Sequence, residues 1–120
     1  MNTGYRIESG KLAIDDLSTG AVLWSGKFDG TPVYKILPIA GTDDCLVLLD
    51  PGLSKKPTFE NLLRVQKSGS VIWRANLPQS HDAYADVLET DEGVEARTWK
   101  GIRVLVDLTD GTVHEVGFSK

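Results

Sequence analysis

Short runs of alternating apolar and polar residues, separated by turns that contain glycine, follow one another along the whole chain. In the segment IRVLVDL, residues 102–108, the apolar side chains at even positions alternate with Arg103 and Asp107. A period of two is typical of a strand with one buried face. Such runs predict about eleven strands in succession, and their short connections leave no room for β-α-β crossovers. The pattern therefore predicts an all-β antiparallel meander.

Two segments depart from this alternation. The run CLVLL, residues 45–49, is apolar throughout, which predicts a strand buried on both faces near the middle of a sheet. The segment PTFENLLRVQ has apolar spacing that, taken alone, would also suit two helical turns beginning near Thr58. The repeat described next favours a strand from Leu62 onward. The preceding residues 50–60 then form a long loop, the largest insertion in the chain.

Three hairpins align on Gly20, Gly69 and Gly111, and read AIDDLSTGAVLW, LLRVQKSGSVIW and VLVDLTDGTVHE. Each has an apolar strand, a polar turn that ends in glycine, and a second strand. A hairpin of this kind ends its turn with a residue at positive φ, which glycine adopts without steric cost. The recurrence indicates that the string is a hairpin corner rather than an active-site motif.

Further strands precede each hairpin. The second and third units each contain four strands, whereas the first unit lacks its first strand. The aligned glycines lie 49 and 42 residues apart (69 − 20 and 111 − 69), a period that suits the blades of a propeller. We interpret residues 1–120 as one domain with units at about 4–28, 33–77 and 84–118.

The first hairpin resembles the quinoprotein (PQQ-like) β-propeller repeat, whose signature is Ala-x-Asp-x-x-Thr-Gly-x-x-x-Trp. The first unit matches this signature at Asp16, Thr19, Gly20 and Trp24, with Ile14 in place of Ala. The second unit keeps Gly69 and Trp73, and the third keeps Asp107 and Gly111. The resemblance implies that the tryptophan docks between neighbouring blades. Cofactor-binding members of that family use a complete ring with a central funnel, so we expect no cofactor in a chain of three units.

Three units are fewer than the roughly four to eight blades of a closed propeller. The units could pack as a β-sandwich or partial propeller, two chains could join as a homodimer with six blades, or the chain could be a piece of a larger ring. In the third unit Glu115 stands where the others have tryptophan. A last unit with no successor needs no docking residue, so we favour the first arrangement.

Composition and charge narrow the expected partners. The net charge of −4 and a pI near 5.1 argue against nucleic acid, whose phosphates require a concentrated basic surface. No apolar run approaches the roughly 20 residues of a membrane helix, so no membrane is expected.

The single cysteine, Cys45, forms no internal disulfide. The N-terminal residues lack a signal-peptide pattern, which predicts a cytoplasmic protein.

Few residues suggest catalysis. His81 lies beside Asp82 in a loop, and His114 lies on a strand facing away from the core. Neither has the three or four converging ligands of a metal site. Cys45 opens the buried run, so we expect a core thiol. The acidic pairs at residues 15–16, 43–44 and 91–92 lie at turns, which aspartate favours. We therefore predict no catalytic, metal or cofactor residues.

A group of residues outside the repeat suggests an interaction surface. Trp99 shares a polar strand face with Glu95 and Arg97, which predicts an exposed indole. The long loop is of a length typical of recognition elements, and His81 lies in another loop. The candidate surface consists of Lys55, Lys56, Phe59, His81, Asp82 and Trp99.

We therefore predict a non-catalytic binding module whose partner is another protein. Two alternatives remain open at this point. One is a small hydrolase that uses carboxylates from the turns. The other is a structural subunit that completes a six-bladed ring by dimerising.

Overall fold

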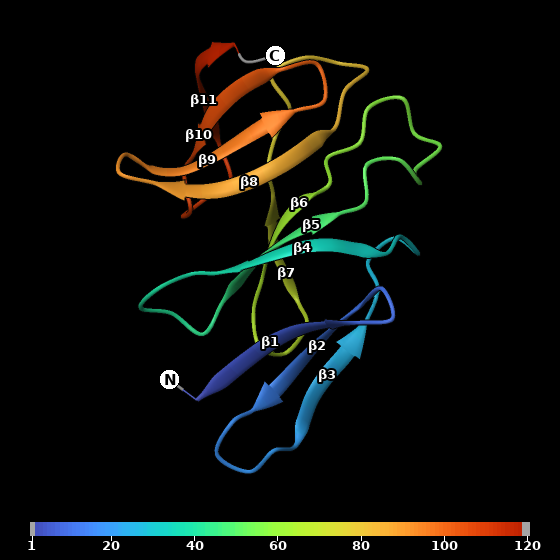
Figure 1. Ribbon diagram of the computed structural model, residues 1–120, viewed down its shortest axis with the longest axis vertical. Coiled ribbons are helices and arrows are strands. Elements are labelled where there is room, and N and C mark those ends of the chain that lie inside the picture. The colour runs from blue at the N-terminus through green and yellow to red at the C-terminus, as the bar shows by residue number, and fades with distance from the viewer. Residues whose placement is uncertain (1, 119–120) are drawn as a thin grey trace.

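A computed structural model describes residues 2–118 and contains eleven strands in three antiparallel sheets (Figure 1). The first sheet contains β1 (Thr3–Glu8), β2 (Lys11–Asp16) and β3 (Val22–Gly26). The second contains β4 (Val33–Pro38), β5 (Cys45–Leu49), β6 (Leu62–Val65) and β7 (Val71–Arg74). The third contains β8 (Tyr84–Thr90), β9 (Gly93–Thr98), β10 (Ile102–Val106) and β11 (Val113–Phe118). The predicted all-β meander is confirmed.

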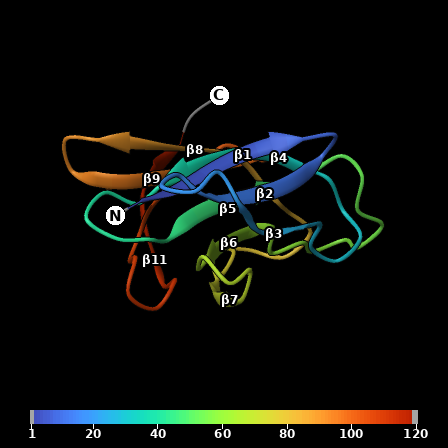
Figure 2. The ribbon, with the colours of Figure 1, turned by 90° about the horizontal axis from the view of Figure 1, so that it is seen from below.

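The three sheets follow one another along the long axis of the molecule, with the second between the first and the third (Figure 1). Each sheet keeps its strands in chain order. Viewed from below, the first strands β1, β4 and β8 lie toward one side and the last strands toward the other (Figure 2). Residues 2–118 contain no helix, and hence none that could cross a membrane.

The strand β5 is buried on both faces, as its unbroken apolar run predicts, because the second sheet is covered on both sides. Its odd-numbered residues contact the first sheet and its even-numbered residues contact the third. The core toward the first sheet contains Leu12, Ile14, Phe28, Val33, Cys45, Val47, Leu49, Phe59, Leu63 and Val65. The core toward the third sheet contains Leu46, Leu48, Leu62, Trp73, Ala75, Tyr84, Val87, Ala96, Ile102, Val104 and Val106.

Each of the two repeat tryptophans packs on the turn glycine of the next sheet. The indole of Trp24, on β3, lies against Gly69, and the indole of Trp73, on β7, lies against Gly111. A Cβ atom at Gly111 would lie 2.6 Å from the Trp73 ring. Trp73 Nε1 also donates a hydrogen bond to the carbonyl oxygen of Leu108, at 2.8 Å. Gly69 and Gly111 are therefore required for two reasons: the turn needs a positive φ, and the indole ring packs too close to leave room for a Cβ atom.

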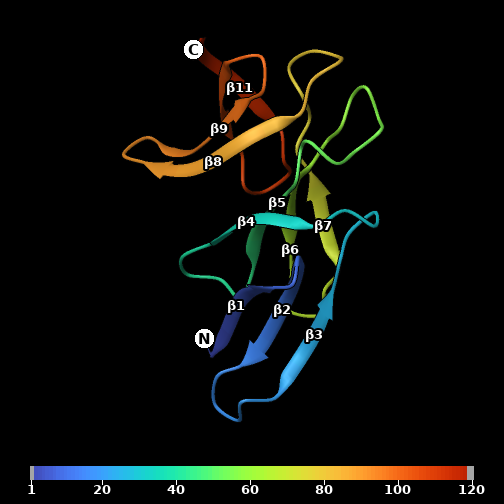
Figure 3. The same ribbon diagram turned by 45° about the vertical axis from the view of Figure 1, so that its right-hand side comes forward.

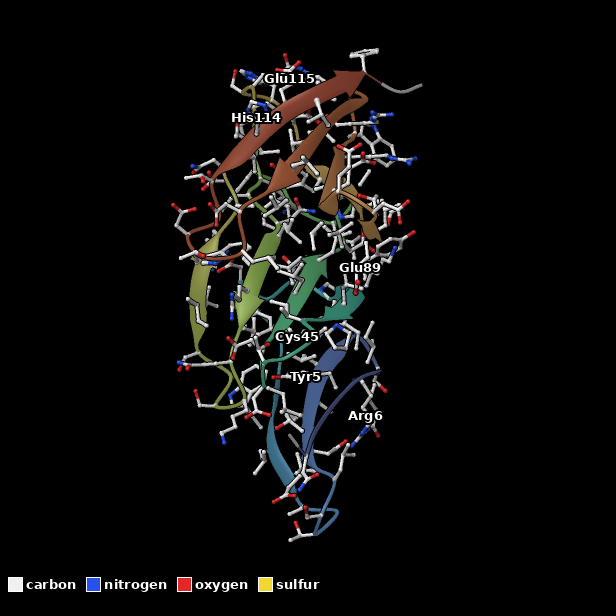
Figure 4. The ribbon with its side chains drawn as sticks, turned by 90° about the vertical axis from the view of Figure 1, so that its left-hand side faces the viewer. Tyr5, Arg6, Cys45, Glu89, His114 and Glu115 are labelled. Carbon is white, nitrogen blue, oxygen red and sulfur yellow. The ribbon has the colours of Figure 1, made fainter. Side chains whose placement is uncertain are left out.

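These tryptophan–glycine contacts form a docking series that stops at the first and third sheets: no tryptophan of the described residues packs on Gly20, and the third sheet has Glu115 at the tryptophan position. Apart from Gly20 and its two chain neighbours, no heavy atom of residues 2–118 lies within 4 Å of a Cβ built at Gly20. At the other end, Glu115 lies on β11, away from the first sheet (Figure 4). The outward face of the first sheet bears an ion pair between Arg6 and Asp15 (2.8 Å). That of the third bears Glu95 with Arg97 at 3.4 Å. Both ends of the stack thus present charged groups to solvent.

The turns of the repeat differ in one respect that the sequence explains. In the first and third units, Asp16 and Asp107 accept hydrogen bonds from the N–H two residues further on (2.8 and 2.9 Å). The second unit has Val65 at this position, and its turn is one residue shorter, closed by Gly69 N–H donating to Gln66 O. An apolar side chain cannot accept such a bond, and the chain uses a tighter turn instead.

Two local expectations need comment. The strand from Leu62 is confirmed, and residues 50–61 contain no strand. The expected strand position of Trp99 is wrong, because β9 ends at Thr98 and Trp99 lies in the following turn. Its expected exposure is nevertheless confirmed, at 74%.

The substitution Gly69→Ala tests the docking of Trp24, with Gly20→Ala as its matched control. Both glycines have positive φ, 86° and 76°, so both variants should lose about 1 kcal/mol of unfolding free energy from backbone strain. Only at Gly69 does the new Cβ meet an indole, which should add about 1–3 kcal/mol. Urea denaturation measures the difference, and equal losses would contradict the docking.

Candidate functional site

Five of the six residues of the predicted interaction surface line a single pocket of about 350 Å³, which we name the Trp99 pocket. They are Lys56, Phe59, His81, Asp82 and Trp99. Lys100, which the sequence analysis did not include, also lines it, whereas Lys55 does not. The pocket therefore assembles side chains from residues 51 to 100.

Three connecting segments form the walls of the Trp99 pocket. The long loop of residues 50–61 and the segment leading into β8 lie side by side (Figures 1 and 3). Phe59 N–H donates to Asp82 O at 3.0 Å, and Phe59 forms a short parallel bridge with Ala83. His81 N–H donates to Thr58 Oγ1 at 2.8 Å. The third segment is the turn between β9 and β10, which carries Trp99.

A buried asparagine joins the long loop to the third sheet. The Asn61 amide nitrogen donates to Leu49 O (2.9 Å) and Tyr84 O (2.8 Å), and its oxygen accepts from Tyr84 N–H (2.7 Å). Asn61 is fully buried. All three bonds lie inside the core, so the amide fixes where the loop leaves β5 and where β8 begins.

Asp82 connects the segments with one carboxylate oxygen and leaves the other unpaired. Its Oδ1 accepts from Ala83 N–H (2.9 Å) and Lys100 N–H (3.2 Å), which holds the turn that carries Trp99. Trp99 N–H donates in addition to Ala83 O at 2.8 Å. Asp82 is only 5% exposed, and its Oδ2 is buried with no hydrogen-bond partner among the described residues. An unpaired buried acceptor is costly and unusual.

The chemistry of the Trp99 pocket is mixed. Trp99 exposes an aromatic face, whereas Phe59 is only 3% exposed and belongs to the core toward the first sheet. Lys56 and Lys100 are exposed and line the same pocket. The site can thus offer aromatic contact, one buried acceptor and basic groups to a ligand.

Cys45 and His114 lie outside the Trp99 pocket. Cys45 lies in the core, near Tyr5 and between the first two sheets (Figure 4). Burial raises the pKa of its thiol to about 12, so the nucleophilic thiolate is disfavoured. His114 is exposed on β11. Both positions agree with the sequence predictions.

The acidic pairs are engaged in turns and ion pairs. Asp44 pairs with Arg64 at 2.6 Å, and Asp43 accepts from the Thr3 hydroxyl at 3.0 Å. Asp16 and Asp43 also line a groove of about 440 Å³ between the first two sheets. Within residues 2–118, no three histidine, cysteine or acidic residues are placed to hold a metal ion.

Among residues 2–118, two carboxyl groups have displaced pKa values, and both are lowered. At Asp86, burial raises the pKa, but the hydrogen bonds from Lys35 and Val87 N–H outweigh it. At Asp110, the N–H and hydroxyl of Thr112 stabilise the carboxylate. Neither group is shifted toward the protonated form that a general acid requires near neutral pH.

Sequence reasoning did not identify Asn61 or Lys100. Asn61 is a polar residue placed directly before a buried apolar strand, and this position was a usable signal for a buried hydrogen-bonding role. Lys100 joins the site through its backbone N–H, which Asp82 accepts, and through its place in the turn after β9, which no sequence pattern indicates.

One family model, described as "Domain of unknown function (DUF7957)", matches residues 30–118. The match contains β4 to β11 and every residue that lines the Trp99 pocket. No curated protein matches the chain.

Asn61→Ala should strongly destabilise the protein. The change leaves the N–H and carbonyl of Tyr84 unpaired in the core, at a cost of about 3 kcal/mol or more. Asn76→Ala is the control, because the Asn76 side chain is exposed and its loss should cost below about 0.5 kcal/mol. Urea denaturation distinguishes the two, and similar midpoints would contradict the role given to Asn61.

Stability should fall in alkaline solution. The raised pKa of Cys45 means that the unfolded chain releases the thiol proton first, so the thiol's contribution is complete below about pH 9 and is lost as pH rises toward about 12. The pKa values of the phenols of Tyr5, which is partly buried, and Tyr84, which is buried, are also raised, mainly by burial. We expect a loss of about 1 kcal/mol from Cys45 by about pH 10. Urea unfolding of wild type and Cys45→Ala across this range tests it, because the variant should show the shallower decline.

Proposed function

The chain belongs to the family described as a domain of unknown function, DUF7957, and from its surface we propose that it is a non-catalytic protein-interaction module. Its binding surface is the Trp99 pocket, where a short segment of a partner protein docks. The observation that carries this proposal is the convergence of an exposed tryptophan with a buried, half-unpaired carboxylate in one pocket.

The exposure of Trp99 supports a contact role. An indole that is 74% exposed keeps a large apolar surface in water, and tryptophan is among the residues that contribute most to protein interfaces. A pocket of about 350 Å³ lies within the range of sites that accept small groups, and one or two side chains of a peptide would fill it.

The walls of the pocket support binding without large rearrangement of their backbone. Phe59 N–H donates to the backbone carbonyl of Asp82, and the Asp82 side chain accepts from Ala83 N–H. Asn61 attaches these segments to two sheets. Groups held in this way lose little conformational entropy on binding. The long loop is therefore a built wall of the site rather than a free connection.

We further propose that the three sheets form a partial propeller of the quinoprotein-like type, built from a single chain. The docking of Trp24 on Gly69 and of Trp73 on Gly111 supports the resemblance. Charged outward faces and Glu115 at the last docking position favour a single chain over a six-bladed homodimer. We place the protein in the cytoplasm, where a free thiol such as that of Cys45 stays reduced.

Selection from a library of random dodecapeptides displayed on phage tests the proposed function. Peptides enriched on the wild-type chain should bind Trp99→Ala at least about tenfold more weakly. The matched control is Tyr34→Ala, which removes another exposed aromatic residue, 58% exposed and outside the pocket. Isothermal titration calorimetry with the synthetic peptides gives the affinities.

Two results would overturn the proposal. One is the failure to enrich any peptide on the folded wild-type chain. The other is a set of peptides that bind Trp99→Ala as tightly as the wild type.

A further inference from the structure

We infer that the Trp99 pocket recognises a basic side chain, lysine or arginine, whose cationic group pairs with Asp82 Oδ2 while its stem lies against Trp99. This inference rests on the proposed function and names the ligand chemistry of the same site. Its starting point is an unmatched acceptor: Oδ2 is buried and has no partner among the described residues, although Oδ1 of the same carboxylate accepts two N–H groups.

The ligand group must be a hydrogen-bond donor, because a carboxylate only accepts. A cation is the best donor, since a charge-assisted hydrogen bond is about twice as strong as a neutral one. Asp82 is 95% buried, which follows from its 5% exposure, so water screens such a pair less than it would at the surface. A cationic donor therefore satisfies both the charge and the vacant hydrogen-bonding capacity of Oδ2.

The chain's own cations do not take this place. Lys56 and Lys100 line the pocket, yet neither forms an ion pair with Asp82 among the described residues. The Lys100 ammonium instead lies 3.5 Å from Ser80 O. His81 is exposed, and its ring contacts the Ser80 hydroxyl at 3.2 Å. The acceptor is therefore left for a group from outside.

The walls suit the rest of a basic side chain. A cation over the face of tryptophan gains a further electrostatic attraction, and arginine also stacks on aromatic rings. The methylene stem of lysine or arginine is apolar, which matches the exposed indole of Trp99 in the pocket.

The lysines at the pocket make the site selective among basic segments. Lys56 and Lys100 would repel a run of positive charges but attract carboxylates beside a single basic residue. The expected ligand is therefore an extended segment in which one lysine or arginine is flanked by acidic residues. A polycationic segment would bind less well.

Peptides that require Trp99, obtained by the phage selection above, provide the probe. Each should contain a lysine or arginine. Norleucine in place of lysine keeps the methylene stem but removes the ammonium group, and citrulline in place of arginine keeps the shape but removes the charge. We expect binding to the wild-type chain to weaken at least about tenfold. This comparison leaves the protein unaltered, so it does not depend on the folding of a variant.

Asp82→Asn gives the second arm, because asparagine retains an oxygen for the two N–H groups and places a donor at the unpaired position. This variant should bind the basic peptide at least about tenfold more weakly and should no longer distinguish arginine from citrulline. Asp91→Asn, at an exposed position in the turn between β8 and β9, is the control and should keep the preference.

The outcomes separate this inference from the proposed function. Peptides that require Trp99 but bind equally with norleucine or citrulline would overturn the basic-side-chain inference and leave the interaction module intact. An Asp82→Asn chain that stays folded and keeps the preference for charge would also overturn the inference. The absence of any peptide that requires Trp99 would overturn both.

Discussion

The contact between an indole ring and the turn glycine of the next sheet determines how the three sheets associate. Trp24 and Trp73 are each four residues beyond their own turn glycine and reach the glycine of the following repeat. Because the donor lies on the last strand of one sheet and the acceptor lies in a turn of the next, the contact has a direction. The hairpin motif therefore contains both the tryptophan that docks and the glycine on which it docks. Repetition of the motif associates the sheets one after another.

The contact between tryptophan and turn glycine explains the burial of the middle sheet. A sheet that donates a tryptophan to one neighbour and accepts one from the other is covered on both faces, so its central strand β5 must be apolar at every position. The outer sheets are covered once and carry ion pairs such as Arg6–Asp15 on their free faces. Charged outer faces are what keep terminal repeats in contact with water. The hydropathy of each strand thus follows from its place in the docking series.

The sequence predicted the local elements well because hairpins depend on nearby residues. Alternation, glycine at the turn ends and the recurring tryptophan are enough to place the strands. The sequence predicts the candidate surface one residue at a time, from the exposure of Trp99 and the length of the loop. It places Trp99 in a strand, whereas the structure places it in a turn. The sequence does not predict that these residues come together in one pocket, because the bridge between Phe59 and Ala83 joins positions distant in the sequence. The burial of Asp82 depends on all three segments that form the pocket, so the pattern of residues within one segment cannot predict it.

The position of the Trp99 pocket follows from which parts of the chain belong to the repeat and which do not. Turn glycines and docking tryptophans are committed to sheet association, so a residue such as Trp24 cannot also serve a partner. The long loop before β6 has no equivalent in the other units, and it contributes Lys56 and Phe59. Trp99 lies outside the docking series and is not needed to join sheets. A repeat scaffold can therefore vary these connections without disturbing its core, and a binding surface is most readily built where the repeat is interrupted.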